Sequence, residues 1–222
     1  MNRVDFSVAS QAGSALATNK LIKNTYMLLS ATLIFSAIMA AVSVVVQPPG
    51  MTYLVCVIGS MLLGIFVLPK TANSSAGLGV IFLITGLLGF GLGPIITQYL
   101  ALPKGPQIVG TAFGGTGIIF LSLSGYALTS KRDFSFMGGF LFAGMMVVML
   151  TMIANIFLDI PGLALAMSAA IILLMSGLIL FDTSRMINGG ETNYIFATYG
   201  LYLSIFNIFI SLLHILGVMG DD

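Results

Sequence analysis

Charged side chains are scarce in this sequence. They make up 7% of the 222 residues, whereas hydrophobic residues make up 58%. An ordinary soluble domain carries about 25% charged residues. A soluble protein of this length could not keep so little charge on its surface without aggregating, whereas a bilayer solvates apolar side chains from outside. The shortage of charge therefore excludes a soluble fold and favours a protein embedded in a membrane.

Other shortages exclude other classes of protein. The net charge is only +1, so the protein has no excess of positive charge to attract nucleic acid, and we expect no nucleic-acid partner. Cys56 is the one cysteine, which excludes an internal disulfide framework and a cysteine-ligated metal site. The His, Cys and carboxylate residues also show no spacing typical of metal ligands, so we predict no metal site. The first 23 residues lack the short apolar core of a signal peptide.

Long stretches without charge fill the rest of the chain. An ionised group at mid-bilayer costs roughly 2.5–3.5 kcal/mol, so membrane spans should lie in the gaps between charges. Residues 24–69 are long enough for two spans, since one needs about 20 residues, and Gln47-Pro48-Pro49-Gly50 divides them. The expected helices lie near residues 25–46, 51–68, 77–100, 108–129, 137–158, 163–182 and 194–217.

These spans define the predicted architecture. The fold class is all-α, a polytopic membrane bundle of seven transmembrane helices surrounded by lipid. Residues 24–220 form one transmembrane domain. Residues 1–23 are polar and carry no hydrophobic pattern, and we expect them to be a disordered cytoplasmic tail.

The basic residues predict the orientation, because Lys and Arg gather on the cytoplasmic side of membrane proteins. With seven spans, Lys104 lies alone on one side. The other basic residues share the opposite side: Arg3, Lys20, Lys23, Lys70, Lys131, Arg132 and Arg185. We therefore expect a cytoplasmic amino terminus and a periplasmic carboxyl terminus.

Small residues cluster in the third and fourth spans. Gly86, Gly89 and Gly93 recur at spacings of three and four before Pro94, and Gly110 and Gly114 are four apart. Small residues let helix backbones approach closely in lipid, so we interpret both sets as helix-packing surfaces. A nucleotide-binding loop is a poor alternative for the second set, because no Lys-Ser or Lys-Thr follows it.

A few polar groups interrupt the last two spans. Ser204, Asn207, Ser211 and His214 recur at spacings of three and four, which places them on one face of the seventh helix. That face is either a polar cavity or proton path, or a surface that hydrogen-bonds inside the bundle. Asp182 is either a solvated helix end or a site facing the interior, while Glu191-Thr192-Asn193 resembles a turn and cap for the last helix.

The same residues give little support to an enzyme. Ser122-Leu123-Ser124-Gly125 together with His214 is only loosely similar to the motif of intramembrane serine proteases. An intramembrane aspartyl protease needs two facing carboxylates, and only Asp182 is available. We predict no catalytic residue.

Several longer motifs resemble the Bax inhibitor-1 family, and within it the bacterial YccA branch. They are Asn24-Thr25-Tyr26, Gly89-Phe90-Gly91-Leu92-Gly93-Pro94-Ile95, Phe181-Asp182-Thr183, Gly189-Gly190-Glu191-Thr192-Asn193-Tyr194 and Leu201-Tyr202-Leu203-Ser204-Ile205-Phe206-Asn207. The resemblance extends from about Lys20 to the end of the chain. It implies a seven-helix bundle in a bacterial inner membrane, with the last helix near the centre.

The resemblance implies two activities. The YccA branch is associated with modulation of FtsH, a membrane-bound AAA+ protease, and a non-enzymatic FtsH modulator is our first hypothesis. The alternative is a pH-sensitive calcium leak, which the family builds from two aspartates. Asp182 matches the first aspartate, but Ser204 stands at the second position, which weakens a calcium site. We expect no resident cofactor, with at most transient calcium or a proton at Asp182.

Overall fold

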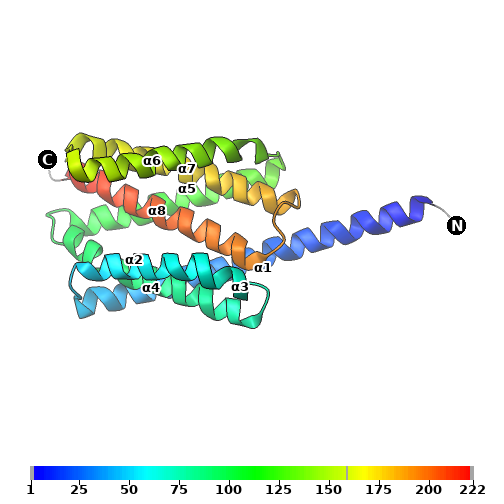
Figure 1. Cartoon of the computed structure of the whole chain (residues 1–222), viewed down its shortest axis with the longest axis horizontal. Helices are drawn as coiled ribbons and strands as arrows, with labels where there is room; N and C mark the ends of the chain where they lie inside the picture. Colours follow the sequence, from blue (N-terminus) through cyan, green and yellow to red (C-terminus); the bar gives the residue numbers. More distant parts are fainter. Residues whose placement is uncertain (1–2, 159, 221–222) are drawn as a thin grey trace.

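The chain folds into a bundle of long helices (Figure 1). The computed structural model describes residues 3–158 and 160–220, with side chains described for residues 16–158, 160 and 162–220. Within these residues seven helical segments are long and apolar enough to cross a membrane, and no strand is present. They run over Leu16–Val46, Met51–Thr71, Ser75–Leu100, Gly105–Ser130, Ser135–Leu158, Gly162–Ile187 and Tyr194–Gly220. The predicted all-α class and the predicted number of spans are confirmed.

Short turns join the elements, so consecutive spans run in alternating directions. In chain order the elements are α1 (Arg3–Val46), α2 (Met51–Leu62), the π-helical turn η1 (Leu63–Val67), α3 (Leu68–Thr71), α4 (Ser75–Leu100), α5 (Gly105–Ser130), the 3-10 turn η2 (Ser135–Met137), α6 (Gly138–Leu158), α7 (Pro161–Ile187) and α8 (Tyr194–Gly220). Helix α8 contacts α1, α4, α5 and α7, which gives it the central position expected from the resemblance.

The second span changes its helical pitch midway, in η1. Pro69 follows this turn and has no N–H to donate to the carbonyl of Ile65, four residues earlier. The chain widens there instead, and the N–H of Leu68 bonds the carbonyl of Leu63, five residues earlier. Gly64 lies in the wide turn and faces Tyr199 of α8, so closely that a Cβ at Gly64 would overlap the tyrosine hydroxyl. The proline thus explains the π-helical turn, and the glycine explains the close contact.

Helix α1 corrects one prediction. It begins at Arg3, so the expected disordered tail is wrong for residues 3–23, which are helical. Starting a helix is costly, whereas extending an existing one adds a hydrogen bond for each residue that is fixed. The segment contains no proline to stop that extension. The 44 residues of α1 span about 66 Å, roughly twice the hydrocarbon thickness of a bilayer, and the amino-terminal part extends away from the bundle (Figure 1).

Candidate functional site

Asp182 lies near the end of α7 and points toward α8. An ideal Cβ built on Gly200 would lie 2.8 Å from Asp182 Oδ2, so the missing side chain of Gly200 makes room for the carboxylate. Asp182 is half-buried, and it has no hydrogen bond or ion pair with any described residue. This placement favours the interior-facing alternative over a solvated helix end.

The structure does not join Asp182 to Ser204 or Asn207. Ser204 is buried, and its hydroxyl donates to the carbonyl of Gly200 at 3.1 Å. Asn207 Nδ2 donates to the carbonyl of Leu203 at 2.8 Å. Both side chains therefore bond within their own helix, and Asp182 has a glycine opposite it on α8.

His214 belongs to a separate contact between α7 and α8. Its Nδ1 lies 2.7 Å from Oγ of the buried Ser168. Ser168 and Asp182 are 14 residues apart in α7, and Gly200 and His214 are 14 residues apart in α8. At 1.5 Å per residue this separation is about 21 Å along the helices, so Asp182 and His214 do not share a cavity.

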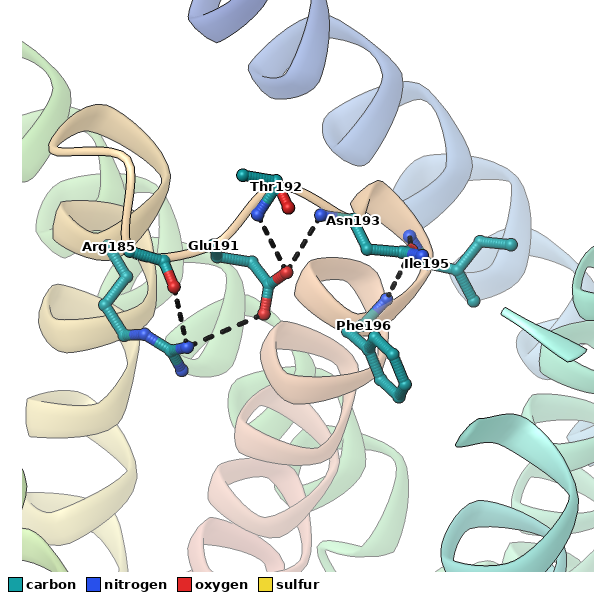
Figure 2. A network of polar contacts seen from close by, with 7 residues as sticks. Arg185, Glu191, Thr192, Asn193, Ile195 and Phe196 are labelled. Atoms are coloured by element: carbon teal, nitrogen blue, oxygen red, sulfur yellow. Dashed lines mark hydrogen bonds and ion pairs between the residues drawn. The ribbon is translucent and has the colours of Figure 1, made fainter. Parts of the chain in front are cut away.

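A polar network closes the loop between α7 and α8 (Figure 2). Asn193 Oδ1 accepts the N–H of Ile195 at 2.8 Å, which caps the first turn of α8. Glu191 Oε1 accepts the N–H groups of the next two residues at 2.9 and 2.8 Å. Glu191 Oε2 lies 3.7 Å from Arg185 Nη2, which also donates to the carbonyl of Gly190. The turn and cap expected here are confirmed.

The same loop reaches the other half of the bundle. Asn193 Nδ2 donates to the carbonyl of Ala72 at 3.0 Å and to Asn73 Oδ1 at 2.8 Å, in the turn between α3 and α4. A surface cavity of about 520 Å³ lies beside this contact, between that turn and the start of α8. The contact therefore ties together the ends of three elements on the face from which α1 emerges.

The third-span glycines lie where α4 meets α1. A Cβ at Gly86 would lie 2.7 Å from Phe35 Cε1, and one at Gly89 would collide with the backbone of Ser36. Gly93 faces Ser43 in the same way. Pro94 follows inside α4 and is buried. Each glycine forms a notch that holds one residue of α1.

The fourth-span glycines correct a second prediction. Gly110 and Gly114 are exposed, and nothing lies within 4 Å of a Cβ built on either. They do not pack against another described helix of this chain. The inward face of α5 passes instead through Ile108, Ala112 and Thr116, on the opposite side of the helix. The spacing of the glycines identified a face correctly but did not reveal which way it points.

A row of hydroxyl side chains on α1 escaped the sequence analysis. Thr25, Thr32, Ser36 and Ser43 are all buried, and their spacings of seven, four and seven place them on one helical face. That spacing was available in the sequence as a signal. Ser36 bonds Tyr202 of α8, and the carbonyl of Thr25 accepts the hydroxyl of Thr198 at 3.3 Å. Tyr26, beside this row, bonds Ser124 of α5.

The described residues offer no constellation for metal chemistry. No three His, Cys, Asp or Glu side chains among them come together as metal ligands. The arrangement suits hydrogen bonding between helices, with one carboxylate held against a glycine.

Comparison with known proteins identifies relatives along the whole chain. The family described as "Inhibitor of apoptosis-promoting Bax1" matches residues 18–221. An "Uncharacterized membrane protein" of Vibrio cholerae is 47% identical over 222 residues, which is all of both chains. The "Modulator of FtsH protease YccA" of Escherichia coli strain K12 is 49% identical over 209 residues, 94% of each chain. The "Inner membrane protein YccA" of Escherichia coli O6:H1 has the same identity and coverage.

The relatives named as membrane proteins agree with the seven apolar helices of the described residues. The protein is therefore a multi-pass inner-membrane protein. It belongs to the Bax inhibitor-1 family.

Proposed function

We propose that this protein modulates an FtsH-type membrane-bound AAA+ protease by being gripped at its amino terminus and then resisting extraction. The relative named as a modulator of FtsH protease supports the choice of partner. The observation that carries the proposal is helix α1. Its amino-terminal part extends beyond the bundle, while the rest is held by side-chain bonds to α5 and α8 (Figure 1).

The amino-terminal extension provides the grip. An isolated helical segment such as this extension is only marginally stable in water, so a protease can unwind it at little cost. The proposal needs the amino terminus to lie in the cytoplasm. The basic residues support that orientation, because all except Lys104 lie on the side of the amino terminus.

The membrane part of α1 provides the resistance. Pulling α1 along its axis would draw Phe35, Ser36 and Ser43 out of the notches formed by Gly86, Gly89 and Gly93. It would also break the bonds to α5 and α8. A chain that is gripped but slowly extracted occupies the protease, and other substrates must wait. This role requires no catalytic residue, and we propose that the protein is not an enzyme.

Deleting residues 2–15 tests the proposal. The deletion keeps Lys20 and Lys23, so the orientation should not change. The truncated protein should live longer than the full-length protein in cells that contain FtsH, and both should have equal lifetimes in cells that lack it. An internal deletion is unsuitable as a control because it would disturb the bundle, so the cells without protease are the control. Equal lifetimes in the presence of FtsH would remove the amino terminus from the mechanism.

A proton-gated cation leak remains the second candidate. Asp182 favours it, because this half-buried carboxylate has no partner among the described residues. Ser204 supplies no second carboxylate, and its hydroxyl is already bonded within α8. A calcium ion usually takes six to eight oxygen ligands. We therefore place a proton at Asp182 ahead of calcium, and we rank the leak below protease modulation.

A further inference from the structure

A polar junction lies in the middle of the bundle and joins three helices. Tyr202 of α8 is 1% exposed. Its hydroxyl donates to the carbonyl of Thr85 in α4 at 3.2 Å and lies 2.6 Å from Ser36 Oγ in α1. A tyrosine hydroxyl has one hydrogen, so Ser36 must be the donor in the second bond. One hydroxyl group thus fastens α1 to α4 and to α8.

We infer that this junction sets the rate at which α1 can be pulled from the bundle. The junction thereby decides whether the protein is extracted slowly and inhibits the protease by occupying it, or is extracted quickly like an ordinary substrate. The inference rests on the proposed function for its biological consequence. Its mechanical part depends only on the contacts of α1.

Steric contacts reinforce the junction. An ideal Cβ on Gly89 would lie 2.6 Å from Ser36 Oγ, so the serine occupies the space that a larger residue would fill. The neighbouring Phe35 lies over Gly86, and its ring meets Phe82 edge-on with centroids 5.5 Å apart. Any movement of α1 along its axis must therefore pull Phe35 and Ser36 out of the notches at Gly86 and Gly89.

The surroundings make the junction difficult to bypass. Bulk water does not reach this depth, so a broken hydrogen bond finds no ready replacement. Ser36 and Tyr202 are both more than nine-tenths buried. The bond between Tyr26 and Ser124 lies nearer the amino-terminal end and is only part-buried. We therefore assign the slow step to the deeper junction.

Two tyrosines of α8 provide a matched test. Tyr202→Phe removes the hydroxyl that joins α1 to α4. Tyr199→Phe removes a hydroxyl in the same helix that has no hydrogen bond with any described residue and lies beside Gly64. Hydrogen bonds between membrane helices contribute modestly, so Tyr202→Phe should speed extraction about threefold or more. Tyr199→Phe should extract at the wild-type rate.

The rate is measured on full-length protein in a lipid bilayer by pulling the amino terminus with magnetic tweezers. Ser36→Ala supplies a second variant that breaks the same bond without changing α8. The double variant Ser36→Ala/Tyr202→Phe should be little faster than either single variant, because all three lose one shared contact. Wild-type extraction rates in both single variants would overturn the inference.

Lifetimes in cells separate the inference from the proposed function. Tyr202→Phe should shorten the lifetime in cells that contain FtsH and should weaken the protection of a second FtsH substrate. Faster extraction under force together with an unchanged lifetime would keep the mechanical role of the junction but overturn the link to the protease. Additive effects of the two single variants would show that Ser36 and Tyr202 act separately, which would also overturn the junction.

Discussion

Two glycine substitutions should change stability in opposite directions. Gly89→Ala places a methyl group where the Cβ would lie 2.9 Å from the carbonyl carbon of Ser36. Real Cβ atoms essentially never come so close, and the obstacle is backbone, which no rotamer change can move. Gly114→Ala places the same methyl group in open space, because nothing lies within 4 Å. The two substitutions therefore share their chemistry and differ only in their surroundings.

The magnitudes follow from two opposing effects. Overpacking a tight contact costs about 1–3 kcal/mol, and a backbone obstacle belongs in the upper half of that range. Replacing glycine by alanine inside a helix returns up to about 1 kcal/mol. Gly89→Ala should therefore lower the free energy of unfolding by about 1–2 kcal/mol. Gly114→Ala should raise it by about 0.5–1 kcal/mol, because it gains helix propensity without meeting an obstacle.

Unfolding in mixed micelles of rising SDS fraction measures both effects. Circular dichroism at low SDS fraction checks that each variant begins with the helix content of the wild type. The midpoint should fall for Gly89→Ala and rise for Gly114→Ala. A shift of the same sign and size in both variants would refute the reasoning, because it would mean that the contact with α1 has no energetic consequence.

Three further predictions concern charge and topology. The hydroxyl and N–H of Ser135 donate to Asp133, which holds the pKa of that carboxyl below its usual range. These hydrogen bonds to the ionised carboxylate stabilise the turn above the ordinary aspartate pKa near 4, and this stabilisation is lost as the pH falls through the lowered pKa. Ser135→Ala removes the hydroxyl, so carbon NMR titration should find a higher pKa for Asp133 in that variant. Ser204→Asp should create a calcium flux into reporter-loaded liposomes, and the double variant with Asp182→Asn should lose that flux. A strong flux in the wild type that survives Asp182→Asn would place the pathway elsewhere. In a variant without Cys56, a cysteine introduced at Ser10 should react with a thiol reagent only from the cytoplasm, and a cysteine near the end of α8 only from the periplasm. Labelling of both positions from one side would contradict the topology.

The spans were predictable because the cost of burying a charge is large. The charge-free stretch over residues 24–69 became two spans, divided at Gln47-Pro48-Pro49-Gly50 as expected, and each later gap became one span. The cap at Asn193 was also predictable, because capping depends on local sequence. The amino-terminal extension of α1 was not, since its helix is a continuation of the membrane span and carries no pattern of its own.

The site was harder to predict than the spans because it depends on helix rotation. A soluble helix reveals its buried face through its apolar residues, but a helix in lipid has apolar residues on every side. Gly86, Gly89 and Gly93 of α4 point inward, whereas Gly110 and Gly114 point outward, although both sets recur at similar spacings. Asp182 likewise faces Gly200, which no spacing within α7 could indicate.

Hydroxyl groups give the missing information about rotation. A hydroxyl that faces the lipid tails finds no partner other than its own helix, whereas one that faces the bundle can also bond a neighbouring helix. The row of Thr25, Thr32, Ser36 and Ser43 on α1 therefore marks the buried face that apolar residues cannot mark. Ser36 meets the notch at Gly89 and the hydroxyl of Tyr202 together. A small residue on one helix opposite a hydroxyl on the next identifies an internal contact, whereas glycines without such a partner, as on α5, remain free to face outward.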